Sequence, residues 1–278
     1  MRYRALVAIF VAMCLGLLTA CGGNDFSDVL DRRELTYDQI VNTGIANSCP
    51  QLPDTVRGNI PFEVGNTYFF DELCIEPQEY FVKEEPTNKR REAEFIAAKP
   101  LTRYTTSLEQ IDGRIKVEEN GVLTLIERGG IDFQPITVLL PGGEEVPFMF
   151  TIKSLVAETE PGFVGINSSS NFEGEYNVPS YRGAVFLDPK GRGVASGYDN
   201  AVAIPSSADE DELARANSKR LDKGIGEISL LVTKVDSTTG EIAGNFISEQ
   251  PSDTDLGADD PEEVKITGIF YAHVDIDS

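Results

Sequence analysis

Apolar and polar side chains alternate with a period of two through much of the chain. In residues 146–153, one set of alternate positions holds Val146, Phe148, Phe150 and Ile152. The positions between them include Met149, Thr151 and Lys153. Successive side chains of a β-strand point to opposite faces of a sheet, so this pattern predicts strands buried on one face. It recurs in 228–232 and 266–274, and further strands are predicted near 67–73, 78–84, 100–108, 113–118, 122–127 and 133–140.

Short turn sequences separate these predicted strands. They include "ENG" at 119–121, "PGGEE" at 141–145 and "DSTTGE" at 236–241. Such sequences are typical of the connections between antiparallel strands. An antiparallel sheet of many short strands must close or stack to protect its edges. The sequence therefore predicts an all-β protein, which we interpret as an antiparallel β-barrel.

Two segments depart from this pattern. Residues 36–48, "TYDQIVNTGIANS", are predicted as a short N-terminal helix, because Thr36 and Gln39 have the spacing of a capping box. Residues 154–224 are rich in Gly, Ser, Asn and Pro. A structureless loop of that length is uncommon inside a compact domain, so we expect a subdomain inserted between two barrel strands.

The N-terminal segment has the features of an export signal. "MRYR" supplies positive charge, and the apolar run "ALVAIFVAMCLGLL" is too short to span a membrane. "LTAC" follows and resembles a bacterial lipobox, which predicts a signal over 1–20, a lipid on Cys21 and a polar tether over 21–34. The alternative is an ordinary signal peptide that is cleaved near Ala20.

The remaining cysteines point to a disulfide. Cys14 leaves with the signal and Cys21 is the lipidation site, so Cys49 and Cys74 are left. Two cysteines in an exported chain most simply form a disulfide. A metal site made from two thiolates is the weaker alternative.

The composition of the chain excludes several classes of function. A net charge of −22 argues against binding to nucleic acid, and against docking by charge on an anionic membrane. His273 is the one histidine, and no G-x-S-x-G motif is present. Catalysis by a histidine-activated nucleophile is therefore disfavoured, and no catalytic residue is predicted.

Two loops remain as candidate binding elements. The acidic stretch 251–263 places Asp253, Asp255 and Asp259 around a glycine, but its spacing departs from an EF-hand. A solvated acidic loop is the favoured interpretation and weak Ca²⁺ binding the alternative. The stretch "SYRGAVFLDPKGRG" (180–193) gathers three cations around Asp188 in an acidic chain. Such a preorganised cationic loop is suited to contacting carboxylates on a partner.

Long blocks of the sequence carry a family resemblance. They include "CIEPQEYFVKEEPTNKR", "GIDFQPITVLLPGGEEVPFMFTIK" and "EPGFVGINSSSNFEGEYNVPSYRGAVFLDPKGRG". On these blocks, residues 35–278 closely resemble the manganese-stabilising extrinsic protein family of photosystem II. The resemblance implies an eight-stranded barrel with a head insertion between the fifth and sixth strands. The first five strands then lie in 35–153, the insertion in 154–224 and the last three strands in 225–278.

The resemblance also implies a role. Family members cap the oxygen-evolving manganese–calcium cluster without supplying its ligands, limit the access of solvent, and help to retain calcium and chloride. The expected partners are reaction-centre and chlorophyll-binding core antenna subunits and other extrinsic subunits. By match, the docking residues are Tyr181, Arg182, Asp188, Lys190 and Arg192, and the disulfide joins Cys49 to Cys74. Residues 89–91 ("KRR") are either a further contact or a solvated charge cluster.

One departure concerns location. Typical cyanobacterial members are released as soluble lumenal proteins, whereas this signal ends in "LTACGG". We therefore expect a lipid-anchored protein on the lumenal side of the photosynthetic membrane, in the thylakoid lumen or on the periplasmic side of the plasma membrane. The alternative function is a periplasmic lipoprotein barrel that binds a small ligand, which would require an open apolar lumen.

Overall fold

The structure is a computed structural model that describes residues 48–84, 93–102, 106–179, 186–187, 194–195, 224–253 and 260–275. The chain divides into two compact units, 1–35 and 36–278, and all the described residues belong to the second. They contain no helix, and hence none that could cross a membrane. The predicted signal, tether and helix fall outside the described residues, except for Ser48.

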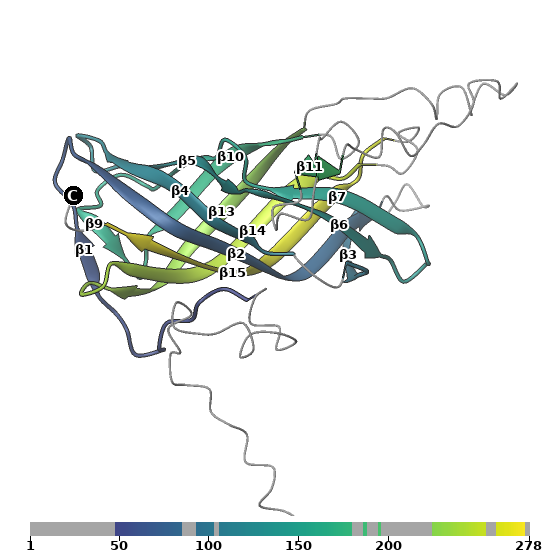
Figure 1. Cartoon of the computed structure of the whole chain (residues 1–278), viewed down its shortest axis with the longest axis horizontal. Coiled ribbons are helices and arrows are strands. Elements are labelled where there is room, and N and C mark those ends of the chain that lie inside the picture. Colours follow the sequence, from purple (N-terminus) through teal and green to yellow (C-terminus); the bar gives the residue numbers. More distant parts are fainter. Residues whose placement is uncertain are drawn as a thin grey trace, which may run out of the picture. The chain divides into compact units, whose positions relative to one another are not determined.

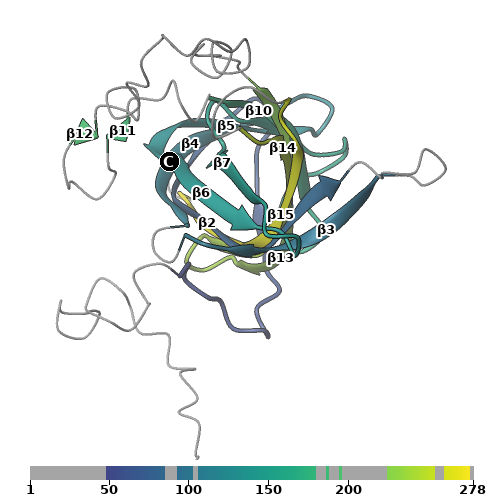
Figure 2. The same cartoon turned by 90° about the vertical axis from the view of Figure 1, so that its right-hand side faces the viewer.

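Eight antiparallel strands close into a barrel (Figures 1 and 2). In order around the barrel they are β2 (Thr67–Glu84), β4 (Leu108–Val117), β5 (Leu123–Ile131), β8 (Val156–Glu158), β10 (Asn171–Val178), β13 (Gly224–Asp236), β14 (Glu241–Pro251) and β15 (Glu263–Val274). Closure comes from the pairing of β15 with β2, in which Val264 lies opposite Val82. The predicted fold class, an antiparallel β-barrel, is confirmed.

Three further strands extend the sheet at one end of the barrel. They are β3 (Glu94–Pro100), β6 (Phe133–Leu139) and β7 (Glu145–Thr151), paired in the order β2–β3–β6–β7. β3 pairs with the second half of β2, while β4 pairs with its first half. One residue, Asp132, separates β5 from β6. β3 and β4 therefore share the position beside β2, β5 and β6 share the next position, and β7 and β8 share the third.

Two small two-stranded sheets complete the described structure. β1 (Asn59–Pro61) pairs with β9 (Gly165–Asn167), and β11 (Phe186–Leu187) pairs with β12 (Val194–Ala195). Both pairs are antiparallel. Neither belongs to the barrel sheet.

Large apolar side chains fill the interior of the barrel. The largest fully buried ones are Phe148, Phe150, Phe172 and Phe246. The Phe150 and Phe246 rings stack with centroids 6.0 Å apart, and the Tyr80 and Phe148 rings lie 6.2 Å apart. An eight-stranded barrel is just wide enough for side chains to fill it. A filled core gives no support to the alternative of an open lumen for a small ligand.

The strand predictions needed three corrections. The strand predicted at 100–108 is wrong, because β3 ends at Pro100 and β4 begins at Leu108. The strands predicted at 67–73 and 78–84 are one strand, β2, whose register shifts beside Glu72 in the left-handed region (φ 53°). Met149 and Thr151, predicted to face outward, are buried as well. The Thr151 hydroxyl is satisfied there, since it donates to the Asp132 carbonyl at 2.7 Å.

The barrel continues into the segment that the sequence analysis assigned to the insertion. β8 and β10 lie within 154–224, yet both are barrel strands. Gly174 in β10 approaches β8 so closely that a Cβ there would lie 2.0 Å from the Val156 carbonyl oxygen. Gly174 therefore serves close strand packing, which composition alone does not distinguish from a loop. The chain between the barrel strands β10 and β13 begins at Pro179.

Candidate functional site

The segment 179–223 connects β10 to β13, and its two ends are held together at the barrel. Val178 pairs with Gly224 at the last position of the β10–β13 ladder. We call this the insertion end of the barrel. The β6–β7 turn and the connection between β14 and β15 lie at the same end, because antiparallel neighbours alternate in direction.

The predicted docking residues cannot be placed. Tyr181, Arg182, Asp188, Lys190 and Arg192 lie outside the described residues, as do Cys21 and 89–91. The flanking backbone is described, because Leu187 pairs with Val194. Three of the docking residues therefore lie in the chain segment 188–193, between two strands that pair with each other.

A buried hydrogen-bond network holds the base of the insertion. The Tyr176 hydroxyl of β10 lies 2.6 Å from Ser248 Oγ and donates to Gln250 Oε1 at 3.2 Å. Gln250 Nε2 in turn donates to the Met149 carbonyl at 2.7 Å. Burial raises the pKa of Tyr176, which keeps its hydroxyl neutral. The network joins β10, β14 and β7 just below the point where the insertion leaves, and the sequence analysis did not identify it.

Carboxylates gather at the insertion end. Burial raises the pKa of Glu262, and the negative charges of Glu144 and Glu84 raise it further. The backbone N–H of Glu262 donates to Ser252 Oγ at 2.8 Å, and that of Ser252 donates to the Glu262 carbonyl at 2.7 Å. This pair closes the predicted acidic loop, of which Asp253 is described and Asp255 and Asp259 are not. Within the described ranges, no three His, Cys, Asp or Glu side chains converge to hold a metal ion.

A second cluster of acidic residues lies at the junction between β5 and β6. Lys153 Nζ pairs with Asp132 Oδ2 at 3.0 Å, and the Ser154 N–H donates to Glu127 Oε2 at 2.7 Å. Both carboxyl groups are buried, and Glu127 Oε1 has no hydrogen-bond partner in the described structure. Burial raises the pKa of Glu127, the Ser154 N–H opposes that shift, and Asp132 adds to it. Because glutamates are abundant in this chain, sequence alone gave no reason to single out Glu127.

The raised pKa of Glu127 predicts a pH dependence of stability. The folded protein binds this proton more tightly than the unfolded chain, so the free energy of unfolding falls as pH rises from the ordinary glutamate range, about 4.3. Glu127→Gln removes this contribution and should flatten the decline, as measured by urea unfolding at about pH 5 and about pH 8. Glu145→Gln, at an exposed glutamate of β7, is the matched control and should keep the wild-type slope. Equal slopes in both variants would contradict the assignment.

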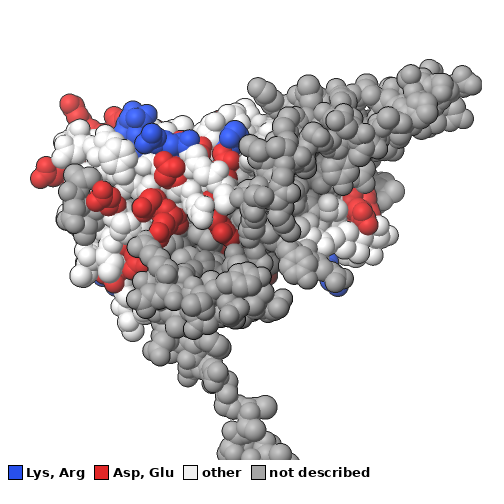
Figure 3. Space-filling model, viewed as in Figure 1, with Lys and Arg blue, Asp and Glu red and all other residues white. Residues whose placement is uncertain are grey.

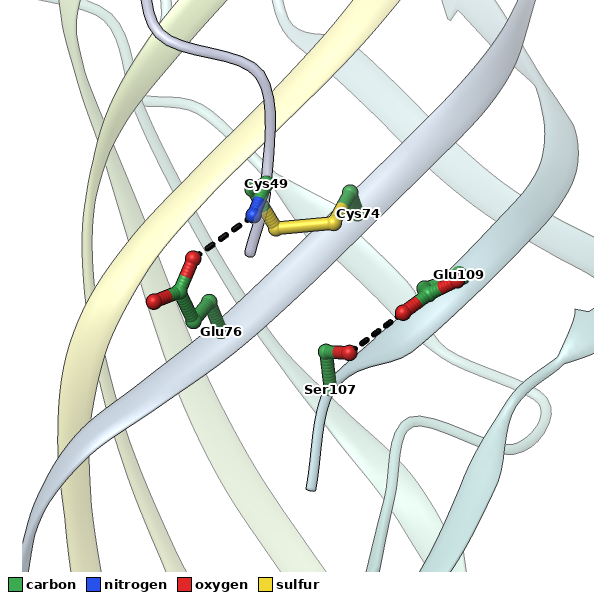
Figure 4. The surroundings of a disulfide bond; sticks show 5 residues. All are labelled: Cys49, Cys74, Glu76, Ser107 and Glu109. Carbon is green, nitrogen blue, oxygen red and sulfur yellow. Dashed lines mark hydrogen bonds between the residues drawn. A yellow bond between two sulfur atoms is a disulfide. The ribbon is translucent and has the colours of Figure 1, made fainter. Parts of the chain in front are cut away.

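The disulfide fastens an N-terminal strap, residues 48–58, to the outside of the barrel. Cys49 and Cys74, with Cα atoms 5.6 Å apart, are joined as predicted, and the Cys49 N–H donates to Glu76 Oε2 at 2.6 Å (Figure 4). The two cysteines form a small buried cluster, separate from the barrel core, with Leu52, Ala243 and Tyr271.

Three contacts continue the strap along the barrel. Lys234 Nζ donates to the Leu52 carbonyl at 2.7 Å and pairs with Asp54 at 2.6 Å. The Gly58 N–H then donates to the Val235 carbonyl at 2.7 Å. These contacts and the disulfide together fix the strap to the barrel.

His273 lies on the outer face of β15. Its Nδ1 atom is 2.7 Å from Asp71 Oδ1 of β2, and the two residues are opposite each other in the β15–β2 ladder. The imidazole side chain is one-third exposed. The geometry is that of a cross-strand pair that supports the closing ladder.

Comparisons with known proteins show the family to which this chain belongs. A family model described as manganese-stabilising protein / photosystem II polypeptide matches residues 33–274. Photosystem II extrinsic protein O of Crocosphaera subtropica is 65% identical over 274 residues, covering 99% of this chain and 98% of that protein. The protein of the same description from Nostoc sp. is 60% identical over 275 residues, covering 99% and 100%. Oxygen-evolving enhancer protein 1, chloroplastic, of Euglena gracilis is 44% identical over 264 residues, covering 95% and 75%. The chain therefore belongs to the manganese-stabilising protein family of photosystem II.

Proposed function

We propose that this chain, a non-catalytic extrinsic subunit of photosystem II, covers the oxygen-evolving manganese–calcium cluster and limits the access of solvent to it. It helps to retain calcium and chloride and supplies no manganese ligand. The family match over residues 33–274 is the observation that carries the proposal. A barrel with a filled core supports it, because a rigid body suits a cover better than a ligand carrier.

The docking element in this proposal is the cationic loop 180–193. It belongs to the segment whose base is fixed by the Val178–Gly224 pair and by the Tyr176 network. A fixed base supports the proposal, because fixing the two ends of a segment reduces the conformational entropy that the segment loses on binding. Arg182 and Lys190 would meet carboxylates on the intrinsic subunits, and Asp188 would accept hydrogen bonds at the same interface.

Reconstitution of photosystem II depleted of its extrinsic subunits tests the loop. Arg182→Ala should weaken rebinding by about 2–5 kcal/mol if its ion pair is desolvated. Asp188→Asn should lower oxygen evolution more than it lowers binding. Bound protein and oxygen rate are measured separately, with Arg57→Ala, at an exposed arginine of the strap, as a matched control. Wild-type rebinding and activity in both loop variants would place docking elsewhere, with the segment 36–44 as the first candidate.

The proposed location is the lumenal side of the photosynthetic membrane, held there by a lipid on Cys21. The "LTAC" sequence supports the anchor. Acyl chains contribute about 0.8 kcal/mol for each buried methylene, so the wild-type protein should stay on membranes through a high-salt wash. Cys21→Ala should either appear in the wash or keep its signal. Release of the wild-type protein by salt alone would contradict lipidation.

A further inference from the structure

Three cations form a patch on the outer face of the barrel. Arg114 and Lys116 of β4 and Arg128 of β5 are all exposed. We call these three residues the basic patch. Figure 3 shows blue side chains gathered along the upper edge of this face, above a field of red ones. The patch is notable because the whole chain carries a net charge of −22.

Apolar side chains lie within the same patch. The ladder register places Phe69 opposite Arg114, Arg114 opposite Ile126, and Ile126 opposite Val156. These four side chains form one row across β2, β4, β5 and β8, about 14 Å long at the usual spacing of strands. Phe69 is 45% exposed and Val156 is 46% exposed. Arg and aromatic side chains are the types that protein interfaces concentrate.

The cations of the basic patch differ from most others on the described surface. Lys83, Lys153, Lys234 and Lys265 are each paired with a carboxylate. Arg114, Lys116 and Arg128 form no such pair among the described residues, although Asp112 and Glu158 border them. Three unpaired cations beside exposed apolar side chains, in a chain with an excess of carboxylates, are suited to an acidic partner.

We propose that the basic patch and the Phe69–Val156 row bind an acidic protein segment of photosystem II, separate from the contact made by the loop 180–193. The inference rests on the proposed function. Carboxylates of that segment would pair with Arg114, Lys116 and Arg128, and an apolar side chain would cover Phe69 and Ile126. A protein partner fits better than an anionic lipid surface, because the protein's acidic surface would repel that surface.

Rebinding to depleted photosystem II tests the patch. Arg114→Glu/Lys116→Glu should weaken rebinding about tenfold at low salt. It should also reduce the salt dependence of binding, because salt screens the attraction between these two cations and the carboxylates of the partner. Arg57→Glu/Lys99→Glu makes the same change in net charge at two exposed cations outside the patch and should change binding less than about twofold. Thermal melting followed by circular dichroism checks that both variants fold.

A photo-cross-linking residue at position 69 identifies the partner. It should give an adduct with an Asp- and Glu-rich peptide of a photosystem II subunit, whereas the same residue at the exposed position 164 should not. Equal weakening in the two double variants would overturn the patch. Patch-dependent binding to phosphatidylglycerol–phosphatidylcholine vesicles would overturn the protein partner in favour of a lipid surface. Failure of the wild-type chain to rebind at all would overturn the proposed function, and this inference with it.

Discussion

Replacing both Cys49 and Cys74 by alanine is expected to lower the free energy of unfolding by about 3.5 kcal/mol. The two cysteines are 25 residues apart, and the loop that they close restricts the unfolded chain. In a chain of this size, that loss corresponds to a fall in melting temperature of roughly 10 °C, measured by circular dichroism. Hydrogen exchange should also rise in the strap, because only non-covalent contacts, at positions 49, 52, 54 and 58, then hold it to the barrel.

The control for this prediction is a reducing agent. It should lower the melting temperature of the wild-type protein to that of the Cys49→Ala/Cys74→Ala variant and leave the variant unchanged. Amide exchange in β13 and β14 should change less than in the strap at temperatures below the transition. A variant that melts with the wild-type protein would show that the strap is held by its other contacts.

Gly226→Ala is expected to destabilise the protein by about 2–4 kcal/mol, through overpacking and a broken buried hydrogen bond. A Cβ at this position would lie 2.3 Å from the Tyr176 ring and 2.5 Å from its hydroxyl oxygen. The ring must move, yet its hydroxyl is held by Ser248 and Gln250 in the buried network. Urea unfolding followed by circular dichroism measures the loss.

Two further variants separate the clash from the cost of alanine in a strand. Gly129→Ala is the matched control, because a Cβ on that β5 glycine meets no atom within 4 Å, and its stability should stay within about 0.5 kcal/mol of wild type. Tyr176→Leu removes the obstructing atoms, so the double variant Gly226→Ala/Tyr176→Leu should lose less than the sum of the single losses. Strict additivity would contradict the proposed contact.

The strands that the sequence predicts well are those with one buried and one exposed face. β13 and β15 have this character, and their apolar positions in 228–232 and 266–274 are buried in alternation. Tyr271 is buried in addition, because it packs with the disulfide and Leu52 on the outside of the barrel. β10 escaped prediction because Gly174 and its polar neighbours reflect close packing against β8 rather than a loop. The break between β3 and β4 also escaped, because "LTRYTTS" has the β-branched and aromatic content of a strand, while β3 ends at Pro100 and β4 begins only at Leu108.

The candidate sites depend on the register between neighbouring strands. The alternation of apolar and polar residues within one strand does not specify that register. The disulfide was predictable because only two cysteines lie outside the predicted signal and lipidation site. Tyr176, Ser248 and Gln250 meet only because β10 and β14 flank β13 with a particular alignment. Likewise Phe69, Arg114 and Val156 are distant in sequence, and the pairing of four strands places them in one row. Both groups of residues depend on the order and the alignment of the strands, which belong to the tertiary structure and not to the pattern within one strand.

The pairing of β15 with β2 closes the barrel, so folding cannot be completed before β15 is available. Lys83 and Glu263, which pair across β2 and β15, are 180 residues apart in sequence. Contacts of such long range slow folding, because the entropy of a large loop is lost before any closing contact forms. During synthesis β2 emerges without its final neighbour and keeps an unpaired edge until β15 follows. A chain cut before Glu263 would keep two unpaired edges, on β2 and β14, and such edges favour aggregation over closure.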